Sequence, residues 1–166
     1  MVLMEVAAQR QTPPARLREL YGGIVASKST HSMKQQMCSI VVDSCIAAGD
    51  VTLAREVLTP LLAAGESMHR AEWLHSEGAL FLLDSQPDGA AAERCFHDAI
   101  AVAREQGAKS FELRAATSLA ELWQQQGKLD DARRLLGDIY GWFIEGFDTA
   151  DLRRAKSLLD VLAAGS

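Results

Sequence analysis

Residues 119–139 decide the fold, and they read LAELWQQQGKLDDARRLLGDI. Apolar residues recur every three or four positions on both sides of Gly127, which is the spacing of one buried face of an α-helix. A glycine at this point interrupts the pattern and allows a tight turn between two helices. Because the connection is short, the two helices are predicted to lie antiparallel as a hairpin.

The second helix of this hairpin recurs upstream at intervals typical of helical repeats. Ala132 has a counterpart 40 residues earlier, at Ala92, and another 38 residues before that, at Ala54. A larger apolar residue stands four positions after each alanine, at Leu58, Phe96 and Leu136. Another apolar residue stands seven positions after each alanine, at Leu61, Ala99 and Ile139. A small residue lets two helices approach closely, and one hairpin cannot bury its apolar face alone. The repeat therefore predicts a stack of hairpins with a continuous core.

The composition also favours helices. The chain has 26 alanines and 21 leucines, against nine valines, six isoleucines and six threonines, and β-branched side chains lose more rotamer freedom in a helix. We expect helices over residues 14–28, 31–48, 51–64, 68–84, 89–106, 110–126, 129–143 and 149–163. The residues expected to cap these helices at their N-termini are Thr30, Asp50, Ser67, Asp88, Ser110 and Asp148.

The quoted stretch resembles a known repeat family. Leu119, Ala120 and Trp123 precede Gly127, and Ala132 opens the second helix. This order of a large and small pair, an aromatic residue, a glycine turn and a small-to-large helix resembles the tetratricopeptide repeat. Weaker copies of the pattern occupy residues 41–54 and 78–99.

Residues 106–120 and 140–152 are similar to the C-terminal tetratricopeptide-like region of large bacterial regulators with a nucleotide cyclase-like or signalling-ATPase portion upstream. The resemblance is strongest over residues 92–160. It implies an all-α fold, a right-handed α-solenoid of antiparallel helical hairpins, with a concave groove that binds a partner. We expect this chain to lack such an upstream portion, and the nucleotide chemistry of those regulators is therefore not expected here.

The domain organisation follows from the repeat units. Residues 1–13 are expected to be a flexible segment, because Pro13 and Pro14 stop any helix from continuing through them. Residues 14–166 are expected to form one helical-repeat domain, with the helix over 14–28 as its N-terminal cap. The predicted units span residues 31–64, 68–106 and 110–143, and a C-terminal capping helix spans residues 149–163. The inward stripe of that helix is Leu152, Ala155, Leu158, Leu159 and Leu162.

Charge and cysteine content narrow the classes of partner. The formal net charge is −5, and no run of Lys or Arg interleaves with aromatic residues, so no nucleic-acid partner is expected. The apolar stretches are too short to cross a bilayer, and no membrane partner is expected. Three cysteines at unremarkable spacing fit reduced thiols, which favours a cytoplasmic protein.

Residues 22–29 come within one residue of the phosphate-loop pattern. Ser27 stands where the pattern requires its second glycine, and Lys28 and Ser29 follow. A phosphate loop also follows a buried strand, whereas residues 15–21 are predicted to be helical. We therefore interpret the segment as a helix break or an irregular turn, and no cofactor is expected.

No metal site or catalytic group is predicted from the cysteines and histidines. Cys38 and Cys45 lie seven residues apart without a ligand motif, and Cys45 occupies a core position of the repeat. Cys95 and His97 point apart on a helix, although a pairing of Cys95 in space with His69 or His75 stays open. Because no convergent catalytic set is visible, we do not expect an enzyme.

The resemblance implies that the first helix of each unit lines the groove. The matching positions are Gln36, Ser39 and Asp43, then Glu72, His75 and Ala79, then Arg114, Thr117 and Glu121. We expect His75, Asp43, Arg114 and Glu121 to orient a partner, with apolar contact from Trp73 or Leu82. This mixed and mildly acidic groove would suit a peptide or helix of some basic character.

The hypothesis that follows is a non-catalytic module that binds a protein or peptide, as a scaffold or a regulatory adaptor. A sensor of small molecules or signalling peptides is the alternative, and an enzyme with an unrecognised site ranks below it. Self-association into a homodimer is a further prediction, because a chain that resembles the tail of longer proteins can expose an apolar end.

Overall fold

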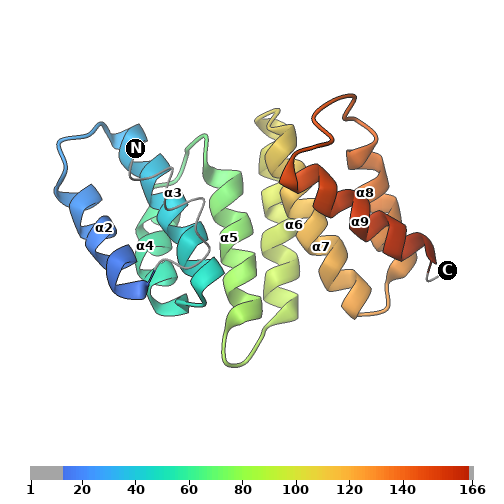
Figure 1. Cartoon of the computed structure of the whole chain (residues 1–166), viewed down its shortest axis with the longest axis horizontal. Coiled ribbons are helices and arrows are strands. Elements are labelled where there is room, and N and C mark those ends of the chain that lie inside the picture. Colours follow the sequence, from blue (N-terminus) through green and yellow to red (C-terminus); the bar gives the residue numbers. More distant parts are fainter. Residues whose placement is uncertain (1–12, 165–166) are drawn as a thin grey trace.

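The computed structural model describes residues 13–164, and every regular element in this range is an α-helix (Figure 1). The helices are α2 (Pro14–Ala26), α3 (His31–Ala48), α4 (Val51–Ala63), α5 (Arg70–Leu83), α6 (Gly89–Glu105), α7 (Lys109–Gln125), α8 (Leu129–Tyr140) and α9 (Ala150–Ala164). The prediction of an all-α fold is confirmed for these residues. Each expected helix is present, with its ends at most three residues from the expected ones.

The helices stack in sequence order along the long axis of the molecule (Figure 1). Consecutive helices pack against each other from α2 to α9. The odd-numbered helices also contact one another, because α3 packs on α5, α5 on α7 and α7 on α9. Within residues 13–164, no comparable contact joins α2 to α4, α4 to α6 or α6 to α8. The odd-numbered helices thus form the more closely spaced row, and we call their common surface the odd-helix face.

Three of the expected capping residues hold the helix starts. The side chains of Thr30, Asp50 and Asp88 accept hydrogen bonds from the first-turn backbone N–H groups of α3, α4 and α6. Gly49 and Gly127 adopt φ values of 74° and 78°, a left-handed conformation that favours glycine after a helix end.

The other three capping predictions are wrong. The hydroxyl of Ser67 accepts from the backbone N–H of His69, but α5 begins only at Arg70 and has no side-chain cap. Ser110 lies inside α7, which begins one residue earlier. Since α9 begins at Ala150, the residue directly before it is not Asp148.

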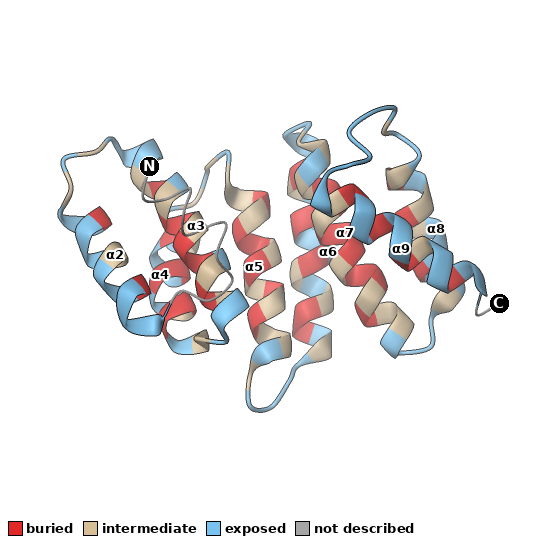
Figure 2. Cartoon of the chain, viewed as in Figure 1, coloured by how far each residue is buried: buried red, intermediate tan, exposed pale blue. Residues whose placement is uncertain are grey.

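Two hydrophobic clusters fill the interior, and buried residues follow the inward side of the helices (Figure 2). The N-terminal core consists of Leu17, Ile24, Cys38, Val41, Val42, Cys45, Leu53, Ala54, Val57, Leu58, Leu61, Trp73 and Leu80. The C-terminal core consists of Leu74, Ala92, Phe96, Ala99, Ile100, Leu113, Ala115, Ala116, Leu119, Ala120, Leu122, Ala132, Leu136, Ile139, Leu152, Ala155, Leu158 and Leu162. Helix α5 belongs to both cores, because Trp73 and Leu80 face one and Leu74 faces the other.

The repeating small residues lie where the pattern places them. Ala54, Ala92 and Ala132 are completely buried. The apolar residues four positions later are completely or almost completely buried as well. The tightest approach is between α5 and α6, where a Cβ atom added to Gly78 would lie 2.6 Å from the ring of Phe96. Only glycine fits this position, since real Cβ atoms do not approach other atoms so closely.

The two end helices cover the cores. Leu17 and Ile24 of α2 are buried in the N-terminal core, and α2 packs on α3. The inward stripe predicted for the last helix is confirmed, with Leu159 only partly buried against the C-terminal core. The predicted flexible segment 1–13 lies outside the described residues except for Pro13, which precedes the first turn of α2.

Candidate functional site

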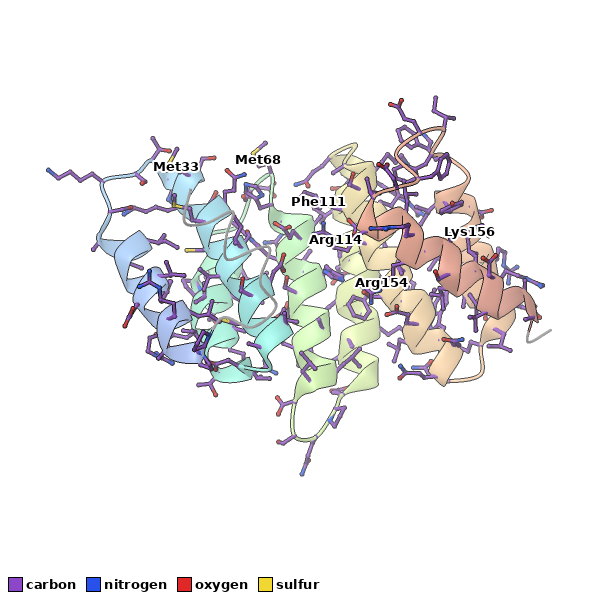
Figure 3. All side chains as sticks on the ribbon, in the orientation of Figure 1. Met33, Met68, Phe111, Arg114, Arg154 and Lys156 are labelled. Atoms are coloured by element: carbon purple, nitrogen blue, oxygen red, sulfur yellow. The ribbon has the colours of Figure 1, made fainter. Side chains whose placement is uncertain are left out.

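Arg114 lies in the middle of the odd-helix face, where charged side chains of three helices meet. Its guanidinium donates to Oε1 of Glu72 on α5 at 3.2 Å and to Oδ2 of Asp151 on α9 at 3.1 Å. The same group lies 5.8 Å from the ring centroid of Phe111, and Figure 3 labels both side chains in the centre of the array. The structure thus brings together the predicted groove residues Glu72 and Arg114.

Asp43 of α3 adds a third carboxylate to this group. Ser76 donates from Oγ to Oδ1 of Asp43 at 3.5 Å. Solvent reaches the Asp43 side chain, yet burial among neighbouring protein atoms and the charge of Glu72 together raise its pKa to about 6, while the charge of Arg114 opposes the rise. We call Asp43, Glu72, Arg114 and Asp151 the acidic cluster, because its three carboxylates outnumber its one guanidinium.

His75 is a neutral member of the same face. Its Nε2 lies 2.9 Å from Oγ of Ser118, and its ring centroid lies 5.7 Å from that of Phe96. Burial, together with the positive charges of Arg114 and Arg154, lowers the pKa of His75 to about 3. The imidazole therefore carries no charge near neutral pH, and it acts on its surroundings as a hydrogen-bonding and packing group.

Three residues that were expected to line the groove are buried instead. The hydroxyl of Ser39 accepts from Nε1 of Trp73 at 2.8 Å and donates to the backbone oxygen of Gln35 at 3.2 Å. Thr117 donates to the backbone oxygen of Leu113 at 2.8 Å. Because Ser39, Thr117 and Trp73 each expose under a twentieth of their surface, the prediction that they line an open groove is wrong.

The remaining predicted groove residues reach solvent. Gln36 is exposed on α3. Glu121 on α7 accepts from Nε of Arg154 on α9 at 2.8 Å and from a second nitrogen of the same guanidinium. An open hollow of about 610 Å³ lies beside this pair, between α7 and α9. Leu82, which was expected to offer apolar contact, is partly buried against the C-terminal core.

Sequence reasoning missed Asp151 and Arg154, because α9 was interpreted only as a cap. In the structure α9 packs on α7 as α7 packs on α5, and so it contributes to the odd-helix face. The signal was present in the spacing. Residues 151, 154 and 158 repeat the intervals of three and four that separate residues 114, 117 and 121.

The cysteines are placed as packing groups. Cys38 and Cys45 belong to the N-terminal core, which confirms the core position predicted for Cys45. Burial, together with the charge of the neighbouring Glu77 carboxylate, raises the pKa of the Cys95 thiol to about 11. A thiol with such a pKa is protonated near neutral pH. The ring of His97 packs against Trp123, 5.7 Å away.

The near match to a phosphate loop lies mostly in helix. Gly22 and Gly23 are inside α2, which continues to Ala26, and the link to α3 follows. The segment is therefore a helix end, in agreement with the interpretation as a break. Among residues 13–164, no group of three or more His, Cys, Asp or Glu side chains is placed to hold a metal ion.

Two further findings concern the chain as a whole. Among the helices described, none combines the length and the apolar character needed to cross a bilayer. Comparison of the chain with protein-family models, with curated proteins and with solved structures found no match.

Proposed function

We propose that this chain is a tetratricopeptide-like, right-handed solenoid that works without catalysis, binding a polypeptide partner on its odd-helix face. Closer spacing of the odd-numbered helices supports a curved array with this face on its concave side. The similarity of residues 106–120 and 140–152 to the helical tails of bacterial regulators supports a regulatory adaptor in the cytoplasm.

The acidic cluster is the observation that carries the proposal. Its three carboxylates and one guanidinium come from α3, α5, α7 and α9, so the folded array is required to assemble it. Its excess negative charge is compatible with the positively charged side chains or the amino terminus of a polypeptide. Core packing does not require these groups, since all four side chains keep contact with solvent.

The test begins with affinity capture of a partner from a lysate, followed by titration of the purified partner. Gln36→Ala and Asp43→Asn change exposed side chains of the odd-helix face. Thr52→Ala on α4 and Asp98→Asn on α6 are the matched controls, because they change exposed side chains of the even-numbered helices. Each odd-face change is expected to weaken binding by about 1 kcal/mol, as is typical of polar interface contacts.

The folded state is monitored by circular dichroism, because these substitutions are expected to change the free energy of unfolding by no more than about 1 kcal/mol. The proposal fails when the variants of the odd-helix face bind like the parent while a change on α4 or α6 abolishes binding. In that case the opposite side of the array is the interface.

A further inference from the structure

The turn between α8 and α9 exposes an unusual amount of apolar surface. Trp142, Ile144 and Phe147 leave 59%, 90% and 47% of their surface open to solvent. These three residues lie within six positions of one another in the turn over residues 141–149, which stands at the upper edge of the array in Figure 1. Large apolar residues grouped on the surface commonly mark an interaction site.

The turn is held in one conformation by its own contacts. The backbone N–H groups of Trp142 and Phe143 donate to the last residues of α8, and Gly146 adopts a φ of 77°. The ring of Phe147 packs on Tyr140 with centroids 5.9 Å apart, and the rings of Trp142 and Phe143 meet edge to face. The side chains of Trp142 and Phe147 are therefore positioned before any partner arrives, which lowers the entropy lost on binding.

The side chain of Lys109 on α7 contacts the turn through a cation–π interaction. The ammonium of Lys109 lies 5.6 Å from the ring centroid of Trp142. The same ammonium donates to Oε2 of the buried Glu112 at 2.7 Å, so its position is itself fixed. The charge of Lys109 is thus used within the molecule.

The charges that flank the exposed residues are negative. Glu145 and Asp148 lie in the turn, and neither forms an ion pair with another described residue. A cavity of about 250 Å³ lies between the turn and α9, and Glu145 and Asp151 both line it. Because Asp151 belongs to the acidic cluster, this cavity adjoins both the turn and the odd-helix face.

We propose that the turn 141–149 docks a cationic amphipathic segment of a partner polypeptide. The apolar side of that segment packs on Trp142, Ile144 and Phe147, and its Lys or Arg side chains pair with Glu145 and Asp148. The negative flanks favour this occupant over an anionic lipid surface, which they would repel. The inference rests on the proposed function as a polypeptide-binding module, and it specifies that the bound segment of the partner is cationic and amphipathic.

The probe is a fluorescein-labelled peptide of about 18 leucine and lysine residues with one apolar helical face. Two control peptides replace every lysine with glutamate or every leucine with serine. Fluorescence anisotropy with the parent chain is expected to show binding of the Leu/Lys peptide, and about tenfold weaker binding of either control peptide. Equal binding of a control peptide would overturn the proposal, because it would show that either the apolar packing or the charge pairing does not contribute to binding.

Variants of the turn locate the binding surface. Ile144→Ser is expected to weaken the binding of the Leu/Lys peptide by about tenfold. Leu83→Ser, which changes an exposed residue at the end of α5, is expected to bind the peptide like the parent. The double change Glu145→Gln and Asp148→Asn is expected to reduce both the affinity and its salt dependence. Its control is Asp98→Asn with Asp138→Asn, which removes two exposed carboxylates elsewhere.

Two other occupants are outcomes that overturn the proposal. Sedimentation of the parent as a dimer that Ile144→Ser dissociates would assign the turn to a second copy. Tighter binding to vesicles of phosphatidylserine and phosphatidylcholine than to the peptide, lost in Ile144→Ser, would assign it to a membrane.

Asp43→Asn in the same titration separates this inference from the proposed function. If only Ile144→Ser loses binding of the Leu/Lys peptide, the result supports docking at the turn and gives no support to binding on the odd-helix face. If only Asp43→Asn loses binding of this peptide, the proposal of docking at the turn is overturned, and the odd-helix face is the interface.

Discussion

The two halves of the array join their odd-numbered helices with different chemistry. In the N-terminal half, the interior link between α3 and α5 is a buried neutral hydrogen bond from Trp73 to Ser39, 2.8 Å long, and Ser76 adds a longer bond to Asp43 at the surface. In the C-terminal half, α7 and α9 are linked by two ion pairs that solvent reaches, Arg114 with Asp151 and Arg154 with Glu121. The same helical packing is therefore supported by polar contacts of opposite kinds.

This difference predicts how the two halves respond to solution conditions. A buried hydrogen bond between neutral groups changes little with salt or pH, whereas partly exposed ion pairs weaken as salt screens them. Helix α5 takes part in both arrangements, because Trp73 faces the N-terminal core and Glu72 pairs with Arg114. Changes near α5 should show whether the halves act independently.

The largest effect is expected from Phe96→Ala in the C-terminal core. Phe96 is completely buried, so truncation leaves a cavity and should lower the free energy of unfolding by about 3–5 kcal/mol. Urea unfolding followed by circular dichroism measures this loss, and Leu58→Ala is the counterpart in the N-terminal core. Should Phe96→Ala produce a second transition, the two cores unfold separately and the comparison is sharpened.

Gly78→Ala is expected to have the next largest effect. The added Cβ would lie 2.6 Å from the ring of Phe96, so overpacking should lower the free energy of unfolding by about 1–3 kcal/mol. Gly137→Ala in α8 is the matched control, since nothing lies within 4 Å of its added Cβ, and it should stabilise slightly.

A second substitution tests the cause of the Gly78 effect. Phe96→Leu in the Gly78→Ala background removes the clashing ring atoms and should recover part of the lost stability. Fully additive losses in the double variant would show that the contact with Phe96 is not the reason for the glycine.

The helices and their buried faces could be predicted from the sequence, because periodicity reports which side of each helix is buried. Ala54, Ala92 and Ala132 were placed in the interior on this basis, and the structure confirms them. Periodicity carries no information on polar residues at the border of a buried face. Ser39 and Thr117 were therefore placed in the groove, although a neighbouring indole and a backbone carbonyl satisfy them in the interior.

The acidic cluster could be predicted only in part, because Asp43, Glu72 and Arg114 were expected in one groove but their pairing and Asp151 were not. Glu72 and Arg114 stand 42 residues apart, and only the packing of α5 on α7 brings them within 3.2 Å of each other. Asp151 joins them because α9 continues the row of odd-numbered helices, a role that a capping helix need not have. Pairing across helices depends on register, and a repeat pattern with units of unequal length leaves register undetermined.

Arg114→Met probes the ion pairs of the C-terminal half. It leaves Glu72 and Asp151 without their common partner beside Asp43, and should lower the free energy of unfolding by about 1–2 kcal/mol at pH 7. Raising the salt concentration should reduce this loss, because the parent loses part of the same interaction. Arg153→Met, an exposed change on α9, is the control and should have little effect at either salt concentration.

The smallest effect is expected from Asp43→Asn, and its sign depends on pH. Burial and the charge of Glu72 raise the pKa of Asp43 to about 6, above its usual value of about 3.9 in an unfolded chain. The folded state therefore binds this proton more tightly, so the carboxyl lowers the free energy of unfolding progressively as the pH rises from about 4 to about 6, and fully above pH 6. Because solvent reaches the side chain, Asp43→Asn should raise the free energy of unfolding by only about 1 kcal/mol at pH 7.5.

Below about pH 4 the carboxyl is protonated in both states, so the gain from Asp43→Asn should disappear. His75 acts in the opposite direction, since its lowered pKa means that stability falls as pH decreases below its usual value of about 6.5. Urea unfolding of the parent and the variant at pH 7.5 and pH 4 separates the two effects, because His75 is common to both chains. Asp98→Asn should change neither value, and an Asp43→Asn variant less stable than the parent at pH 7.5 would show that the carboxylate stabilises the cluster through Arg114.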